Sequence, residues 1–542
     1  MRCTLPPLPS ERRSALERAI IQARDASEQA AKVVLETLAF DKEHAFASLS
    51  PEQRQLRNAL RAKARQLGNG NRKDGTPILI EEIAYSQWHR MLFARFLAEN
   101  NLLMHPIGVA VTLAECEELA AEESEPDAWQ VAARYASAML PGIFRTDDPC
   151  AQVRFALEGR QALENILAGL PPAMFTADDA LGWVYQFWQS KKKKEVNASE
   201  RKIGGADISP VTQLFTEDYM VRFLLDNTLG AWWAARHPTS PLVREFIYLR
   251  FLDDGTPATG SFPGWPDRAA LIRFMDPCCG SGHFDVAAFD ILRKMRMEEE
   301  GLSAADAGDA VLRDNIFGLE LDPRCTQIAA FALALAAWKS GGYRKIPIPQ
   351  IACAGIAVQG QLSEWTKLAG KDVNLRTTLE RLYELFKNAP DLGSLINPAE
   401  LPARDRMFTV DYAQVAPVLE KALTKERESE DPVAAVFGAA VEEVASAAQL
   451  LAGKYTLVAT NVPYLGRGKQ DDVLKEFCEI RYPDAKADLA TVFLERCREF
   501  VTGKGTYALV TPQNWLFLTS YKKFRVHHLH QQTQRHMFVL VY

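Results

Sequence analysis

The chain has 542 residues, enough for roughly three or four domains. Its apolar fraction of 47% and charged fraction of 24% are those of an ordinary globular protein, and no apolar run could span a bilayer. The net charge of −6 argues only weakly against a nucleic-acid partner, because an acidic protein can carry a basic groove. The nine cysteines lack zinc spacing and the start lacks a secretion signal, so we expect a cytoplasmic protein with reduced thiols and no metal site.

The first part of the chain is expected to be helical. Apolar residues at helical spacing across 10–66, and a strongly amphipathic stretch at 80–96, predict a helical N-terminal domain over residues 1–175. The glycine-rich stretch 68–77 predicts a loop between these helices. Residues 176–268 are expected to form a helical connector. Its four consecutive lysines, like the basic residues of 57–73 and 522–525, are most simply solvated helix faces.

Thr216 in the connector precedes two acidic residues and an apolar helical pattern. This order is typical of a helix N-cap, because the Thr hydroxyl can accept a backbone N–H and acids favour the first turn. The residues alone indicate a capped amphipathic helix and nothing more.

A strand–turn–helix unit follows at 270–292. An apolar lead-in predicts a buried strand, and a helix with an apolar face follows the turn. Glycine lets the backbone approach a ligand, and the helix N-terminus offers free N–H groups to an anion such as a carboxylate. The residues of this unit that we single out are Asp276, Pro277, Cys279, Gly280, Ser281, Gly282 and Phe284.

Two further strands end in polar residues. The strand at 316–320 ends in Glu320, at the place where an acidic side chain would hold a ribose diol. The strand at 455–461 leads into Asn461, Val462, Pro463 and Tyr464. Alone, this tip is most simply a turn at a strand end. A short strand at 346–354, a helical insertion at about 360–452, a flexible basic loop at 465–470, a helix at 488–500 and a strand from 505 are also expected.

The order of the three stretches resembles the S-adenosylmethionine-dependent amino methyltransferases that modify DNA bases. That family has D-P-A-C-G-S-G-x-F in the first stretch and N-P-P-Y in the third, and here Cys278 replaces the alanine and Val462 the first proline. The resemblance implies an α/β, Rossmann-like methyltransferase domain over 269–542 that binds S-adenosyl-L-methionine. It implies as cofactor-binding residues Phe215 and Thr216 of the F-T-P segment, the glycine turn, Glu320 and Asn461. Glu217 replaces the proline of F-T-P.

The family's chemistry assigns roles to the tip. The Asn461 side-chain oxygen and the Val462 carbonyl would accept hydrogen bonds from the exocyclic amine of the target base. Pro463 favours extended geometry at the residue before it, so the lost proline should loosen the loop more than alter its chemistry. Tyr464 would stack on the flipped base.

From about residue 75 onward the chain resembles the PglX-type adenine methyltransferases of BREX phage defence, with the DISARM methyltransferase second. The stretches 182–187 and 212–216 carry this likeness. It implies a site-specific DNA adenine N6-methyltransferase with double-stranded DNA and other phage-defence proteins as partners, and no membrane association. Family members continue into a large region that reads the DNA sequence, so we expect a fragment or split product that lacks the last strands of the sheet. A protein glutamine methyltransferase, a cytosine N4-methyltransferase and a non-catalytic subunit with this fold stay open.

Overall fold

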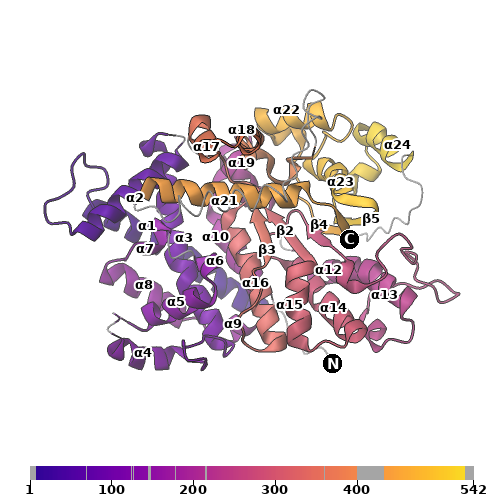
Figure 1. Ribbon diagram of the computed structural model, residues 1–542, viewed down its shortest axis with the longest axis horizontal. Helices are drawn as coiled ribbons and strands as arrows, with labels where there is room; N and C mark the ends of the chain where they lie inside the picture. Colours follow the sequence, from indigo (N-terminus) through magenta and orange to yellow (C-terminus); the bar gives the residue numbers. More distant parts are fainter. Residues whose placement is uncertain are drawn as a thin grey trace. The chain divides into compact units, whose positions relative to one another are not determined.

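The computed structural model describes residues 8–530, except for 69, 124, 126, 145–147, 178, 214–215, 359–360 and 400–431. By their internal contacts the residues group into two units (Figure 1). Residues 1–191, 358–384 and 413–445 make up the first unit, and 192–357, 385–412 and 446–542 the second.

The first unit is built from helices, as the amphipathic pattern predicts. Its core joins α1, α2, α3 and α7, with fully buried Ala31, Leu60, Leu79 and Ile83 at its centre. The helices lying wholly or mostly in this unit are α1 Ser10–Thr37, α2 Pro51–Leu67, α3 Arg72–Glu99, α4 Leu113–Glu122, α5 Ala128–Met139, α6 Pro141–Phe144, α7 Pro149–Gln152, α8 Leu157–Ala168, α9 Ala173–Thr176, α10 Ala180–Ser199, α17 Leu362–Leu368, α18 Val373–Phe386 and α21 Pro432–Ala452.

Helix α3 begins earlier than the sequence predicts. The expected loop reaches only Asn71, whose side chain accepts a hydrogen bond from Lys73 N and caps the helix. Pro77 lies inside α3. As the sixth residue of the helix, it costs α3 one backbone hydrogen bond, to the Lys73 carbonyl, and the helix continues past it.

The second unit contains a five-stranded parallel sheet with the strand order β3-β2-β1-β4-β5. The predicted α/β, Rossmann-like fold with a helical region before it is therefore confirmed. The strands are β1 Phe274–Asp276, β2 Ile316–Glu320, β3 Gln350–Cys353, β4 Tyr455–Asn461 and β5 Val501–Val510. Strand β1 is shorter than predicted, because residues 269–271 form a 3-10 turn, and β5 begins before the expected residue 505.

Helices cover both faces of the sheet (Figure 1). Phe274, Ile316 and Leu457 face one core, which α12–α16 complete. On the other face Tyr455 packs against Phe317 and Phe500. The helices wholly in this unit are α11 Ile208–Thr212, α12 Asp218–Leu225, α13 Ala231–Arg236, α14 His283–Glu300, α15 Ala304–Asp314, α16 Pro323–Gly341, α19 Ala389–Leu392, α22 Asp472–Arg481, α23 Leu489–Phe500 and α24 Lys522–His530.

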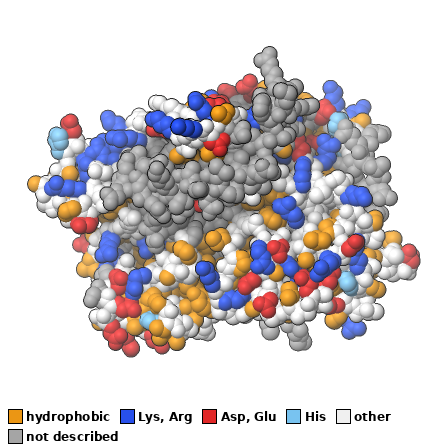
Figure 2. All heavy atoms as spheres, in the orientation of Figure 1, with side chains coloured by type: hydrophobic (Ala, Val, Ile, Leu, Met, Phe, Trp, Pro, Cys, Tyr) orange, Lys and Arg blue, Asp and Glu red, His pale blue; other side chains and the backbone are white. Residues whose placement is uncertain are grey.

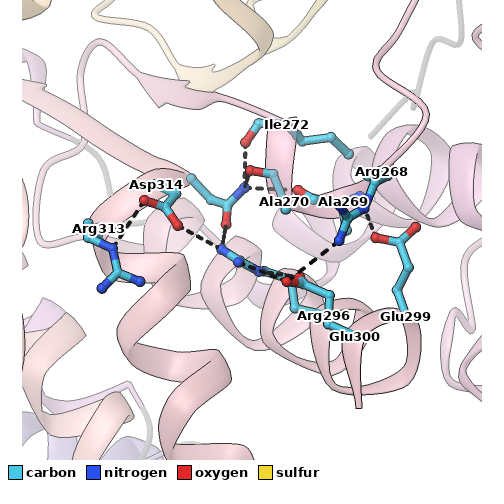
Figure 3. A network of polar contacts seen from close by, with 10 residues as sticks. Arg268, Ala269, Ala270, Ile272, Arg296, Glu299, Glu300, Arg313 and Asp314 are labelled. Atoms are coloured by element: carbon cyan, nitrogen blue, oxygen red, sulfur yellow. Dashed lines mark hydrogen bonds and ion pairs between the residues drawn. The ribbon is translucent and has the colours of Figure 1, made fainter. Parts of the chain in front are cut away.

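A polar network ties the segment before β1 to the start of β2 (Figure 3). The fully buried Asn315 side chain donates to the carbonyls of Ala269 and Ile272 at 2.9 and 2.6 Å. Arg296 of α14 donates to the Asn315 side-chain oxygen at 3.2 Å and pairs with Asp314. Because buried polar atoms need partners, this network sets the alignment of β1 and β2 at their amino ends.

Candidate active site

The turn between β1 and α14 contains two left-handed glycines, Gly280 at φ 54° and Gly282 at φ 87°. A Cβ on Gly282 would lie 3.2 Å from Ala329 of α16, whereas a Cβ on Gly280 would meet no atom within 4 Å. Gly282 is the N-cap of α14, and no side chain caps the helix there. The turn is therefore packed against the protein at Gly282 and open at Gly280, beside uncapped helix N–H groups.

Acidic side chains hold this turn in place. Gly280 N donates to Glu320 Oε2 at 2.9 Å, and Asp322 N donates to the other Glu320 oxygen at 3.1 Å. Cys278 N donates to Asp276 Oδ1 at 3.0 Å, and the Ser394 hydroxyl donates to the Pro277 carbonyl at 2.6 Å. Parallel β1 and β2 thus bring the glycine turn and Glu320 together, as the order of motifs predicts.

The remaining predicted residues of the turn are mostly buried. Cys279 and Phe284 are buried, and the Ser281 hydroxyl lies 3.4 Å from His283 Nδ1. The described cysteines are not paired in disulfides. Among the described residues, no group of three or more His, Cys, Asp or Glu side chains could hold a metal ion.

Three carboxyl groups beneath the turn are nearly removed from water. Burial raises the pKa of both Asp276 and Glu320 to about 7. Asp285, in the first turn of α14, is fully buried, and among the described residues neither of its oxygens has a hydrogen-bond partner. Burial, together with the charge of Asp276, raises the pKa of Asp285 well above its ordinary range. Desolvation favours the neutral form of each group.

Glu320→Gln is expected to change how stability depends on pH. Between pH 4.5 and about 7, native Glu320 keeps a proton that the unfolded chain has released. The native state then binds more protons, so its free energy of unfolding falls as pH rises through this window. The pKa difference corresponds to about 3 kcal/mol. In urea unfolding without cofactor, wild type should lose up to about that amount of stability between pH 4.5 and 8, and Glu320→Gln should lose less because Gln cannot ionise.

The matched control for this measurement is Glu476→Gln, on an exposed residue of α22. It should unfold like wild type at each pH. Asp276 still titrates in Glu320→Gln, so the free energy of unfolding of this variant should depend on pH less than that of wild type but not become constant. Identical slopes for wild type and Glu320→Gln between pH 4.5 and 7 would refute the raised pKa.

The tip of β4 forms a short chain of hydrogen bonds. Asn461 Nδ2 donates to Thr216 Oγ1 at 3.1 Å, and the Tyr464 hydroxyl donates to Asn461 Oδ1 at 2.6 Å. Val462 is buried, whereas Pro463 and Tyr464 are half-buried. Thr216 and Tyr464 together fix which way the Asn461 amide faces. Its oxygen keeps a second lone pair with which it can accept another hydrogen bond.

Two expectations about this tip are wrong. Glu217, not Thr216, is the N-cap of α12, and the Thr216 hydroxyl instead accepts from Asn461. The stretch 465–470 is not a free loop, because Gln470 is buried and its amide donates to the Leu465 carbonyl at 3.0 Å. Phe215, predicted to contact the cofactor, lies outside the described residues.

Asp488 is a neighbour of the tip that the sequence did not single out. It caps α23 through Ala490 N, and Leu489 N donates to the Leu465 carbonyl at 3.0 Å. Burial, and then the charge of Asp488, raises the pKa of Tyr464 to about 12. The Tyr464 hydroxyl therefore stays a donor at neutral pH. The signal that could have found Asp488 is an acid directly before an apolar helix.

Comparison with known proteins adds a second line of observation. The model of the Eco57I restriction-modification methylase family matches residues 314–541, and that of the MmeI DNA-methyltransferase domain matches residues 263–344. The adenine-specific methyltransferase BrxX of Escherichia coli O9:H4 strain HS is 27% identical over 84% of this chain. The chain resembles the PglX-type adenine-specific methyltransferases. The expected resemblance is thus confirmed.

Further relatives extend the same likeness. The adenine-specific methyltransferase PglX of Lacticaseibacillus casei strain Zhang is 26% identical over 83% of this chain. The chain spans 42% of the length of BrxX and 41% of this PglX. The solved DrdV–DNA complex is 13% identical, covering 96% of this chain and 38% of that one with a TM-score of 0.43.

Proposed function

We propose that this chain is the catalytic part of a DNA adenine N6-methyltransferase that uses S-adenosyl-L-methionine. The observation that carries the proposal is the position of Asn461. It ends β4, which pairs with β1, and so lies at the same sheet edge as the glycine turn. The matched relatives named as adenine-specific methyltransferases and the matched DNA-methyltransferase domain support the same reading. None of these names points to a glutamine methyltransferase, a cytosine methyltransferase or a non-catalytic subunit.

The residues of the turn fit the cofactor. No atom of the described residues lies within 4 Å of a Cβ built on Gly280, and the uncapped N-terminus of α14 can bind the carboxylate of a methionine moiety. Glu320 ends the neighbouring strand and can exchange its bond to Gly280 N for a ribose hydroxyl. When bound, the cofactor supplies a methyl group activated on a sulfonium.

Asn461 would act on the acceptor amine. An amine conjugated to a base ring is a poor nucleophile, and acceptors aimed at its N–H groups hold it in the geometry for in-line attack. The Asn461 oxygen has a lone pair for one N–H, and the Val462 carbonyl can accept the other. Thr216 acts as a positioning residue, because its hydroxyl keeps the Asn461 amide nitrogen turned away from the amine.

The direct test is methyl transfer to DNA. The chain is incubated with radiolabelled S-adenosyl-L-methionine and unmethylated bacterial DNA, and the digested nucleosides are separated by mass spectrometry. N6-methyladenine should carry the label. Sequencing that reports base modification, in cells with and without the gene, gives the same answer for the whole system. Label in protein glutamine or in cytosine would contradict the proposal.

DNA binding by this chain alone is expected to be weak and steeply salt-dependent. In Figure 2, acidic and basic side chains are interspersed over α14 and α15, so no single-sign field covers that surface. We expect a dissociation constant on the order of 10⁻⁴–10⁻⁶ M with little sequence preference, as for non-specific binding. Fluorescence anisotropy at several salt concentrations measures it. A tight, sequence-specific footprint would contradict this expectation.

A further inference from the structure

Residues 511–525, which follow β5, are fixed by several side-chain contacts; we call this segment the platform. Trp515 is buried, its indole N–H donates to Thr511 Oγ1 at 3.1 Å, and its ring packs edge-on against Phe524 at 5.6 Å. Arg525 donates to the carbonyls of Trp515 and Leu518 at 2.6 and 2.8 Å. These contacts fix the backbone of residues 515–518 from two sides.

This platform presents two apolar side chains to solvent. Phe517 is 70% exposed and Leu518 is 51% exposed. Because the backbone here is fixed, both side chains stay in water and can enter an apolar partner surface without rearrangement of the loop. We call Phe517 and Leu518 the apolar pair.

Cations follow the apolar pair directly. Lys522 and Lys523, at the start of α24, are both exposed. The remaining exposed side chains of the platform are uncharged and can hydrogen-bond: Gln513, Asn514, Thr519 and Ser520. An apolar pair beside lysines and neutral polar groups complements a polyanion with an apolar interior, which is the character of a DNA duplex.

The platform also lies on the side of the unit that carries the tip of β4. Val510, the last residue of β5, pairs with Asn461, so the chain leaves the sheet beside the tip. Tyr521, in the platform, and Tyr464, in the tip, each have a pKa raised first by burial and then by the charge of Asp488. The same carboxylate therefore lies near both segments.

We propose that the apolar pair is a wedge that enters the base stack of a DNA duplex next to the base that Asn461 receives. Lys522 and Lys523 bind phosphates beside it. Extruding a base costs its stacking energy, and an apolar side chain that fills the vacated space offsets part of that cost. The inference rests on the proposed function, because only a base taken out of the duplex leaves such a space.

The test compares two duplexes of one sequence, one fully paired and one with a single abasic site. The 542-residue chain, saturated with S-adenosyl-L-methionine, is titrated into each. The missing base of the abasic duplex leaves a gap that the wedge can enter without extruding a base. Wild type should therefore bind the abasic duplex about fivefold to tenfold more tightly than the paired one, in line with the stacking contribution of one aromatic side chain. Phe517→Ala/Leu518→Ala should abolish this preference and still bind the paired duplex.

A matched control exists in the same unit. Phe251 and Leu252 are also adjacent and exposed, at 49% and 54%. Phe251→Ala/Leu252→Ala should keep the preference for the abasic duplex. Lys522→Gln/Lys523→Gln should weaken binding of both duplexes equally. It should also lower the slope of log affinity against log salt concentration by about two.

Two results would overturn the wedge. One is an unchanged abasic preference in Phe517→Ala/Leu518→Ala. The other is a wild-type chain that binds both duplexes equally, as a docking surface for a protein would. The proposed function is judged separately by labelled N6-methyladenine. Methylation that persists while the abasic preference is absent refutes the wedge alone, and an intact preference without any adenine methylation refutes the proposed function.

Discussion

Asn461→Ala is expected to lower the rate of methyl transfer to adenine on the order of 100-fold or more while leaving cofactor affinity nearly unchanged. The substitution removes the oxygen that accepts from the amine as charge develops on it. It leaves the glycine turn intact, and that turn is held by Glu320 and Ser394 rather than by Asn461. Single-turnover transfer and calorimetric titration of S-adenosyl-L-methionine measure the two quantities.

Tyr464→Phe is the matched control for this experiment. It keeps the ring that would stack on the base and removes only the hydroxyl that donates to Asn461 Oδ1. Its transfer rate should fall far less than that of Asn461→Ala, because Thr216 still orients the amide. The comparison belongs in a chain whose wild type transfers methyl groups. Full adenine methylation by Asn461→Ala would show that the tip is only a turn at a strand end.

Gly280→Leu is expected to weaken binding of S-adenosyl-L-methionine on the order of 100-fold or more, since the added side chain would occupy the space proposed for the ligand. Among the described residues, a Cβ at this position meets no atom within 4 Å. The chain should therefore fold, with only the cost of a non-glycine residue at φ 54°, about 1–2 kcal/mol. Calorimetric titration measures the affinity.

The control is Gly301→Leu, at the other end of α14. Gly301 is also left-handed, at φ 69°, and a Cβ there also meets no atom within 4 Å. Both variants place a leucine at positive φ and differ in their distance from the turn, so Gly301→Leu should bind like wild type. Gly282 is a poorer position for this test, because any side chain there meets Ala329 and destabilises the protein. Equal cofactor affinity of wild type, Gly280→Leu and Gly301→Leu would show that the cofactor binds elsewhere.

Local patterns in the sequence were enough to predict the parts of the site that depend on neighbouring residues. The glycine turn follows from an apolar run, two glycines and an amphipathic helix. Glu320 and Asn461 follow from apolar strands that end in polar residues, since the carboxyl ends of parallel strands meet at one sheet edge. Each of these signals lies within a short continuous stretch of the chain, which is the range over which periodicity and turn chemistry act.

Only the tertiary structure decided how distant segments complete the site. Thr216 lacks the N-cap role that its local sequence indicates, because Asn461, 245 residues later, supplies its hydrogen bond. The order β3-β2-β1-β4-β5 sets β4 against β1 across an interval that includes an insertion and two other strands. Burial of Asp285 without a partner, and the fixing of residues 465–470 by Gln470, likewise depend on which surfaces pack together. No local pattern contains that information, because side-chain hydrogen bonds and desolvation depend on neighbours in space rather than in sequence.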